Sequence, residues 1–246
     1  MKGIMPPKIR LDHILVRRQI VESLNQAQGL ILAGLVLVDN QMIDKPGTSV
    51  LVEASVAIKE RPPYVSRGGI KLAAALDTFR LKVNDLVVLD VGASTGGFTD
   101  CLLQRQCTHV YALDVGRGQL AHRLRIHPHV TVMEKVNARY PFNLPEQVDL
   151  ITIDVSFISL LLVLNEPTKH LRSGNFIVAL VKPQFEIGKQ EVKRGGVVRE
   201  ARLHAQAISK VVLWAIGQGF RIRGVTASPI QGEAGNKEFF VLLQKI

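Results

Sequence analysis

One stretch of this sequence decides its fold, and it reads Val87-Val-Leu-Asp90-Val-Gly92-Ala-Ser94-Thr-Gly96-Gly97-Phe98. It joins a short apolar strand to a glycine turn and then to the start of a helix. Glycines allow the backbone to approach a ligand closely, and the first N–H groups of a helix attract negative charge. In parallel α/β sheets, ligands bind at the carboxyl ends of the strands, where such a turn lies. The stretch therefore predicts a ligand-binding α/β domain.

Strands and helices alternate on both sides of this turn. We expect strands at 86–91, 109–113, 130–134, 148–153 and 176–181, and helices at 97–106, 119–126, 159–171 and 200–217. Continuous apolar strands separated by helices indicate a parallel sheet that is covered on both faces. Two further strands, at 221–228 and 238–243, follow each other without a helix and should pair antiparallel. The expected fold class is α/β, with a Rossmann-like seven-stranded sheet whose last strand is antiparallel.

A domain boundary is indicated by the charged, proline-rich run Lys59-Glu-Arg-Pro-Pro63. Such a run cannot continue a helix or a central strand. We therefore expect a small α+β domain at residues 1–61, a linker at 62–66 and the larger domain at 67–246. Helices at 10–17 and 23–33, then strands at 35–38 and 49–56, are expected in the small domain.

The composition narrows the function classes. A net charge of +10 favours an acidic partner, with nucleic acid ahead of an anionic membrane surface. The two cysteines, Cys101 and Cys107, form neither a disulfide framework nor a metal-binding pair, so we predict no metal site. The first residues lack the apolar core of a signal peptide, and no apolar run is long enough to span a bilayer. A cytoplasmic location is therefore expected.

The identity of the ligand follows from what the turn lacks. A dinucleotide site needs a glycine where Ala93-Ser94 stands, and a P-loop needs a lysine where Phe98 stands. A carboxylate at the strand end, Asp90, suits a ligand with an amino group, and Asp114 ends the next strand, where it can accept hydrogen bonds from ribose hydroxyls. The alternative is a glycine turn that only packs a helix on a strand. The expected cofactor is S-adenosylmethionine, bound by Asp90, Gly92, Ser94, Gly96, Gly97, Phe98, Asp114, Asn137 (beside the adenine) and Asp154.

Four ionisable residues stand at the ends of elements that face the same sheet edge: Lys71, Asp154, Lys182 and Glu238. Methyl transfer to a hydroxyl needs in-line alignment and a group that takes the hydroxyl proton. A lysine can take that proton only when burial and a second lysine lower its pKa. We interpret Lys182 as the base, Lys71 and Glu238 as its supports, and Asp154 as a positioning group that also stabilises the sulfonium of the cofactor. Taken singly, such a lysine is more often a surface residue and Asp154 could cap a helix, so the interpretation depends on all four.

The order Lys, Asp, Lys, Glu resembles the corresponding set of the FtsJ-like ribose 2′-O-methyltransferases. The TlyA branch, whose members are often labelled haemolysins, is more similar still. The segments that carry the resemblance cover almost the whole chain: 64–72, 90–99, 112–120, 154–159, 182–188, 195–199 and 228–239. Thr95 and Phe98 depart from the proline and tryptophan that are usual in the FtsJ type. The resemblance implies a class I methyltransferase domain that modifies cytidine ribose in ribosomal RNA, preceded by an RNA-binding module first named for a small-subunit ribosomal protein.

The predicted RNA-binding residues follow from that module and from the basic surface of the larger domain. The sequences Arg10-Leu-Asp12 and 30–40 match the module, but its second helix, Ser23-Leu-Asn-Gln-Ala-Gln-Gly29, has no basic residue where relatives have several. RNA affinity should therefore depend more on the larger domain, where the loop at 184–199 is either a lid over the RNA or a solvated connection. The predicted RNA-binding residues are Arg10, Arg17, Arg18, Arg67, Arg123, Arg125, Lys189, Lys193, Arg194 and Arg199.

Two other function classes stay open. A membrane-lytic protein would need a spanning helix or a long cationic amphipathic stretch, and the sequence shows neither. A ribosome-assembly factor that binds RNA without catalysis would not need the four ionisable residues. The expected partner is ribosomal RNA or a ribosomal subunit, and the chain is expected to be a monomer or a weak dimer.

Overall fold

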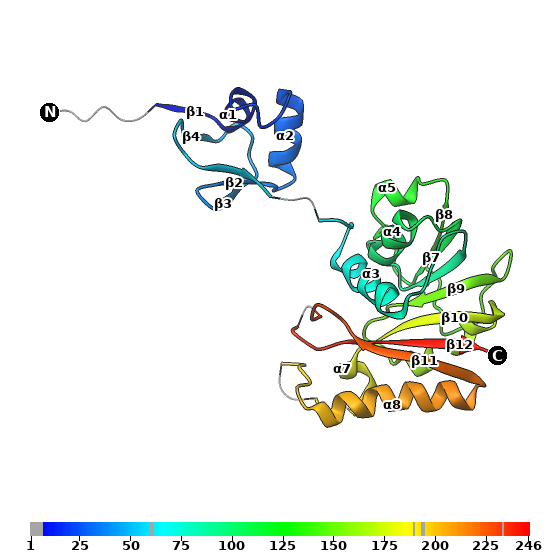
Figure 1. The fold of residues 1–246 in the computed structure, drawn as a ribbon. Coiled ribbons are helices and arrows are strands. Elements are labelled where there is room, and N and C mark those ends of the chain that lie inside the picture. Colours follow the sequence, from blue (N-terminus) through cyan, green and yellow to red (C-terminus); the bar gives the residue numbers. More distant parts are fainter. Residues whose placement is uncertain (1–6, 60–61, 189, 193–194, 233) are drawn as a thin grey trace. The chain divides into compact units, whose positions relative to one another are not determined.

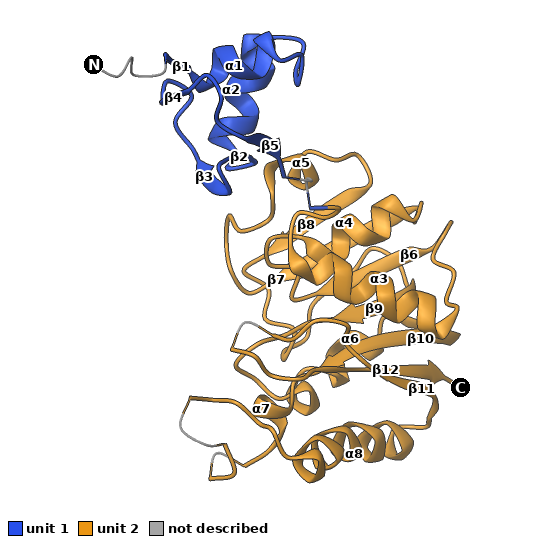
Figure 2. Ribbon diagram, turned by 60° about the vertical axis from the view of Figure 1, so that its left-hand side comes forward, with its two compact units in different colours: residues 1–62 blue, residues 63–246 orange. Residues whose placement is uncertain are grey.

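The computed structural model describes residues 7–59, 62–188, 190–192, 195–232 and 234–246 (Figure 1). The chain divides into two compact units, Met1–Pro62 and Pro63–Ile246 (Figure 2). The predicted linker is shorter than 62–66, because its last residues are bonded within the second unit. The backbone N–H of Val65 donates to Asp100 at 2.8 Å, and Ser66 precedes the first residue of a helix.

The first unit is a small α+β fold. Its elements in chain order are β1 (Lys8–Arg10), α1 (Leu11–Arg17), α2 (Leu24–Leu32), β2 (Val36–Val38), β3 (Gln41–Ile43), β4 (Ser49–Leu51) and β5 (Val56–Ile58). β1 pairs with β4, and β2 pairs with both β3 and β5, all antiparallel. The single strand that was predicted at 49–56 is wrong, because a turn at residues 52–55 separates β4 from β5 and sends them to different sheets.

The second unit is built on a seven-stranded sheet. Its strands are β6 (Val87–Val91), β7 (His109–Asp114), β8 (Val130–Glu134), β9 (Val148–Ile153), β10 (Leu171–Val181), β11 (Phe220–Ala227) and β12 (Phe239–Lys245). Their order across the sheet is β11-β12-β10-β9-β6-β7-β8, and β12 is antiparallel to both neighbours. The other pairs are parallel. The expected fold class, with its antiparallel last strand, is therefore confirmed.

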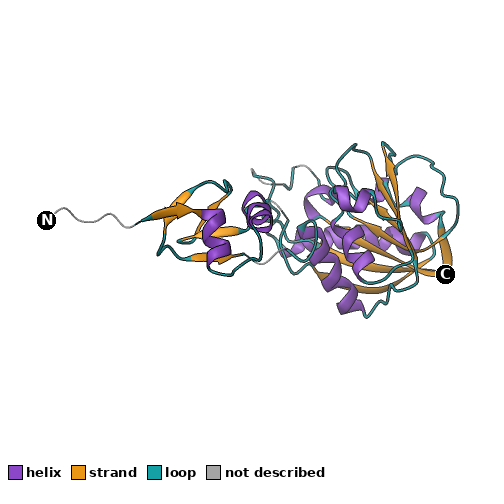
Figure 3. Ribbon diagram, turned by 90° about the horizontal axis from the view of Figure 1, so that it is seen from above, coloured by secondary structure: helices purple, strands orange, loops and turns teal. Residues whose placement is uncertain are grey.

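Helices cover both faces of this sheet (Figures 1 and 3). They are α3 (Arg67–Phe79), α4 (Gly97–Gln104), α5 (His122–Arg125), η1 (Leu160–Leu162), α6 (Asn165–Thr168), α7 (Pro183–Glu186) and α8 (Ala201–Gly217). Successive strand residues point to opposite faces: Val88 packs with α3 and α4, whereas Leu89 lies in the cluster that contains α8. Both apolar clusters are buried, which explains why these strands read as continuous apolar runs.

Two predicted helices are largely absent. The stretch 159–171 contains only the short turns η1 and α6, and β10 already begins at Leu171. Pro167 lies inside it and has no backbone N–H to donate, which prevents a longer helix. The helix predicted at 119–126 is reduced to α5. Within the described residues, no helix is both long enough and apolar enough to cross a membrane.

Candidate active site

A cavity of about 780 Å³ opens at the carboxyl ends of β6, β9 and β10. The turn after β6 supplies one wall, and the segments that follow β9 and β10 supply another. All four ionisable residues that were singled out from the sequence line this cavity: Lys71, Asp154, Lys182 and Glu238.

Lys182 and Asp154 form the first of two pairs. They follow the neighbouring parallel strands β10 and β9, so their side chains emerge side by side. The Nζ atom of Lys182 lies 2.5 Å from Oδ1 of Asp154 and donates to Oγ of Ser156 at 2.8 Å. This Asp154 oxygen is buried, and its contact with Lys182 is an ion pair.

Lys71 and Glu238 form the second pair. Lys71 lies in the second turn of α3 rather than at its start, and Glu238 immediately precedes β12. Lys71 Nζ donates to Glu238 Oε2 at 2.6 Å, and the two side chains are only 11% and 3% exposed. A buried charge without its partner is strongly destabilising, so the loss of either residue should lower the stability of this unit.

Packing accounts for the glycines of the turn. A Cβ on Gly92, whose φ is +84°, would lie 2.2 Å from the carbonyl oxygen of Asp154. A Cβ on Gly96 would collide with Leu124, and one on Gly97 would lie 2.2 Å from Ser66 Oγ. Gly92 and Gly97 also line the cavity, together with Ser94 and Phe98, whereas Gly96 is not among the lining residues. The glycines therefore let protein segments meet closely in addition to bordering the ligand space.

Asp90 has a different place from the one its position suggested. It is completely buried and does not line the cavity; its carboxylate accepts hydrogen bonds from Thr99 Oγ1 at 2.7 Å and from Thr152 Oγ1 at 2.9 Å. Burial raises the pKa of Asp90 to about 6, against the opposing effect of the two threonine hydroxyls. We therefore assign Asp90 to the support of the turn, because it ties β6 to α4 and β9, and not to direct contact with a ligand.

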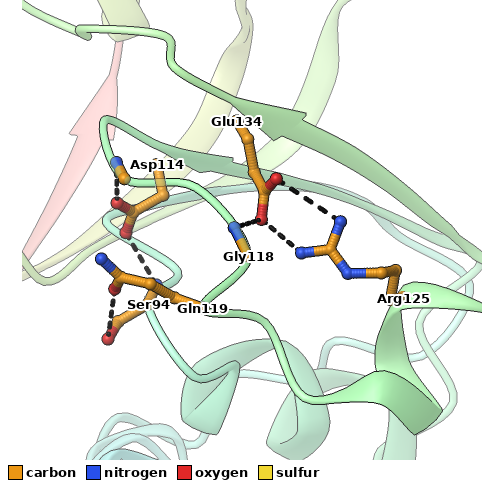
Figure 4. A network of polar contacts seen from close by, with 7 residues as sticks. Ser94, Asp114, Gly118, Gln119, Arg125 and Glu134 are labelled. Atoms are coloured by element: carbon orange, nitrogen blue, oxygen red, sulfur yellow. Dashed lines mark hydrogen bonds and ion pairs between the residues drawn. The ribbon is translucent and has the colours of Figure 1, made fainter.

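Asp114 organises the neighbouring loop (Figure 4). Its two carboxylate oxygens accept from the backbone N–H groups of Ser94 and Gly116, each at 2.7 Å. Glu134, at the end of β8, accepts from the N–H of Gly118 and is paired with Arg125. Each Asp114 oxygen keeps acceptor capacity for a further donor such as a ribose hydroxyl. Neither Asp114 nor the exposed Asn137 is among the residues that line the cavity.

The predicted RNA-binding arginines of the first unit have different surroundings. Arg10 makes two hydrogen bonds to Asp12 and thereby lowers the pKa of that carboxyl to about 2. Arg18 donates to the backbone carbonyls of Ala54 and Val52, which makes it a structural group. Arg17 is exposed at the end of α1, and among the described residues no polar partner is found for it.

In the second unit, too, some of the predicted arginines are paired within the protein and others are exposed. Arg123 is paired with Asp100 at 2.5 Å, and Arg125 with Glu134. Arg67 is exposed beside the cavity and donates to the Gln231 carbonyl at 2.8 Å, and Arg199 is exposed as well. The remaining three predicted residues, Lys189, Lys193 and Arg194, lie outside the described residues, so the lid hypothesis stays a prediction.

Several cavity residues were not predicted. Ser156 and Phe157 follow Asp154, and Gln184 and Phe185 follow Lys182. Phe157 is 92% exposed, has a φ of +63°, and lies with its ring centroid 5.4 Å from that of Phe185. Their closeness in sequence to the two catalytic candidates was the available signal, since residues at one sheet edge share one cavity.

A parallel sheet with an antiparallel last strand, a glycine turn after β6 and two lysine–carboxylate pairs in one cavity together define a methyltransferase domain. The chain belongs to the FtsJ-like methyltransferase family, whose model matches residues 64–245, and an S4 domain model matches residues 9–56.

Three similar proteins support this membership. A Mycobacterium tuberculosis protein named "16S/23S rRNA (cytidine-2'-O)-methyltransferase TlyA" is 44% identical over 98% of this chain and 91% of its own length. "Hemolysin A" of Brachyspira hyodysenteriae is 37% identical over 94% of this chain and 98% of its own. A solved structure from Streptococcus thermophilus is 42% identical, with a TM-score of 0.74 over 97% of this chain and 89% of that one.

Proposed function

We propose that this chain transfers a methyl group from S-adenosylmethionine to the 2′-hydroxyl of a cytidine in ribosomal RNA, with Lys182 as the general base. The observation that carries the proposal is that two lysine–carboxylate pairs line the one cavity that the β6–α4 turn borders. The names of the relatives supply the nucleotide and the RNA class.

The residues of the turn suit this cofactor. Gly92, Ser94, Gly97 and Phe98 line the cavity and offer backbone and a flat ring, without the lysine that a nucleoside triphosphate would need. The Asp154 carboxylate lines the same cavity, and its negative charge suits a positively charged group. S-Adenosylmethionine supplies an electrophilic methyl group on a positively charged sulfur, and Asp114 would accept from its ribose hydroxyls.

The chain's own residues then handle the proton. The acceptor hydroxyl would take the methyl group in place of the cofactor's sulfur, and its proton would pass to Nζ of Lys182, which must enter the step as the neutral amine. Asp154 and Ser156 hold that nitrogen in place at 2.5 Å and 2.8 Å. Lys71, fixed by Glu238, adds positive charge to the same cavity, which favours the developing alkoxide.

The first unit supplies the expected RNA contact. An S4 domain model matches it, and Arg17 presents an exposed guanidinium that no described residue neutralises. Such a group suits a phosphate oxygen. We accordingly expect ribosomal RNA or a ribosomal subunit to be the partner, and the reaction to take place in the cytoplasm.

The decisive experiment incubates the full chain with labelled S-adenosylmethionine and ribosomal subunits that lack the modification. We expect incorporation into RNA for the wild type and for Lys82→Ala, a matched control at an exposed lysine away from the cavity. Lys182→Ala and Lys182→Arg should both abolish it, since arginine keeps the charge but cannot act as a base at neutral pH.

The other function classes give different results in the same experiment. A non-catalytic assembly factor would bind the subunits without any incorporation. A membrane-lytic protein would release dye from anionic liposomes without the cofactor. Either result, obtained with well-folded wild-type protein and correctly assembled subunits, would contradict the proposal.

A further inference from the structure

Two segments carry the residues around the proposed base, one at 154–160 after β9 and one at 182–186 after β10. Near the start of the two segments, Lys182 Nζ donates to Ser156 Oγ at 2.8 Å and pairs with Asp154 at 2.5 Å. A lysine nitrogen stands on a flexible four-carbon stem, so its position depends on the groups that hold it. The separation of the two segments therefore decides whether this nitrogen stays in place.

The far ends of the two segments are joined by Glu186. Its carboxylate accepts from Ser159 Oγ at 2.5 Å and from the backbone N–H of Leu160 at 2.8 Å. Between the two ends, the Phe157 and Phe185 rings lie with their centroids 5.4 Å apart. The segments are thus connected at three levels, and at the far end the connection is made by a carboxylate.

Glu186 is held in the protein interior from two sides. It is only 5% exposed, and burial raises the pKa of its carboxyl, against the opposing effects of the hydrogen bonds from Ser159 and Leu160 and of the charge of Lys210. Lys210, on α8, also donates to the backbone carbonyl of Glu186 at 2.6 Å. Hydrogen bonds to a carboxylate are short and strong, so they hold their donors in a defined geometry. The end of the second segment is therefore fixed to the first segment and to α8.

The position of Glu186 gives it no direct contact with the reacting groups. It is not among the residues that line the cavity, whereas Ser156 and Lys182 are. Any effect of Glu186 on methyl transfer must therefore pass through the two segments that it joins. Such an effect can be large, because a displacement of about 1 Å at a reacting group can cost about 100-fold in rate.

We infer that Glu186 is a positioning residue, which keeps segment 154–160 against segment 182–186 and thereby holds Lys182 Nζ where it can take the proton of the acceptor. The inference rests on the proposed function, because Lys182 acts as a base only there. Loss of Glu186 should lower the rate of methyl transfer in the bound complex and leave the binding of both substrates unchanged. A residue that only supports folding would lower the melting temperature without changing the rate of the folded protein.

The test measures single-turnover methylation of unmodified ribosomal subunits with saturating labelled S-adenosylmethionine, well below the melting temperature of each variant. Glu186→Ala should lower the rate by about 100-fold. Glu186→Gln should restore most of it, since its amide oxygen can accept from Leu160 and its amide nitrogen can donate to Ser159. The matched control is Glu146→Ala, which removes a glutamate that accepts from Tyr111 at 3.1 Å outside the cavity lining and should keep the wild-type rate.

A double-mutant cycle tests the route of the effect. If Glu186 acts through the contact between Lys182 and Ser156, the combined rate loss in Glu186→Ala with Ser156→Ala should be smaller than the product of the two single losses. Independent effects would multiply. The affinity for S-adenosylhomocysteine and the KM for subunits should be those of the wild type in Glu186→Ala.

A second variant keeps the inference testable if Glu186→Ala does not fold. Ser159→Ala then takes its place, also in the cycle, and should lower the rate by roughly 10-fold, as for the loss of one hydrogen bond to a charged group. A wild-type rate in the folded variant, no recovery in Glu186→Gln, multiplying losses in the cycle, or a change confined to cofactor or RNA binding would each overturn the inference and leave the proposed function intact. If the wild type methylates no subunits, the proposed function fails and the inference fails with it.

Discussion

The buried carboxylate of Asp90 should make the second unit less stable as the pH rises. Its pKa is about 6 in the folded protein, against an ordinary value of 3.8, because burial disfavours the charge. A proton bound more tightly by the folded state contributes stability that is full below the unfolded pKa and is lost as the pH rises through the folded pKa. Between pH 5 and pH 8 the two pKa values correspond to a loss of about 1.4 kcal/mol.

Asp90→Asn removes this titration and should keep the contacts to Thr99 and Thr152, since threonine hydroxyls both donate and accept. The free energy of unfolding can be measured by urea titration with the fluorescence of Trp214, the chain's one tryptophan, which stacks on Phe220 in the same unit as Asp90. The difference between variant and wild type should shift in favour of the variant by about 1.4 kcal/mol from pH 5 to pH 8.

Other groups also titrate in this range, but they are shared by both proteins and cancel in the difference. Asp85→Asn is the matched control, because Asp85 is an exposed aspartate of the same unit. Its difference from the wild type should be the same at both pH values. If the Asp90→Asn difference is also constant within about 0.4 kcal/mol, the burial argument for Asp90 is refuted.

Three further predictions concern the two units separately. Lys71→Met should lower the free energy of unfolding by about 3 kcal/mol or more, because Glu238 is left as a buried unpaired charge. In urea titrations the double variant, Lys71→Met with Glu238→Leu, should recover most of that loss. It should not recover the methylation activity. Gly92→Ala should lower both stability and activity, since its φ is +84° and its Cβ would meet backbone; equal urea midpoints for variant and wild type would count against this. Arg17→Ala should weaken RNA binding and reduce the salt dependence of RNA affinity (the slope of log affinity against log salt concentration) by about 1, without a change in melting temperature. Arg18→Ala should instead lower the melting temperature of the first unit. The reverse pattern would show that the two roles are exchanged.

The sheet and its two pairs of catalytic candidates could be predicted because both depend on short sequence patterns: apolar runs that form strands, and the residues that follow them. Continuous apolar runs such as 148–153 mark strands that are buried on both faces, and parallel strands bring the residues after them to one edge. Lys182 and Asp154 therefore could be placed together from sequence alone. The Lys71–Glu238 contact follows less directly, since it depends on how α3 docks beside β12.

What could not be predicted depends on which way a side chain points. Asp90 and Asp154 both stand at strand ends, yet one turns into the protein between two threonines and the other into the cavity. The wrong helix at 159–171 has a simpler cause, because apolar periodicity alone cannot distinguish one helix from two short turns, the second of which contains Pro167.

The place of β12 connects catalysis to the completion of folding. Glu238 contacts Lys71 across 167 positions of the chain, and it reaches the cavity only when β12 inserts between β10 and β11. A nascent chain that still holds β12 in the ribosomal tunnel can already carry the β6–α4 turn, Asp154 and Lys182. Its Lys71 has no carboxylate to meet, and two sheet edges are still open. Such a chain could form the β6–α4 turn but could not assemble the Lys71–Glu238 pair. Methylation activity would therefore appear only after β12 has completed the sheet.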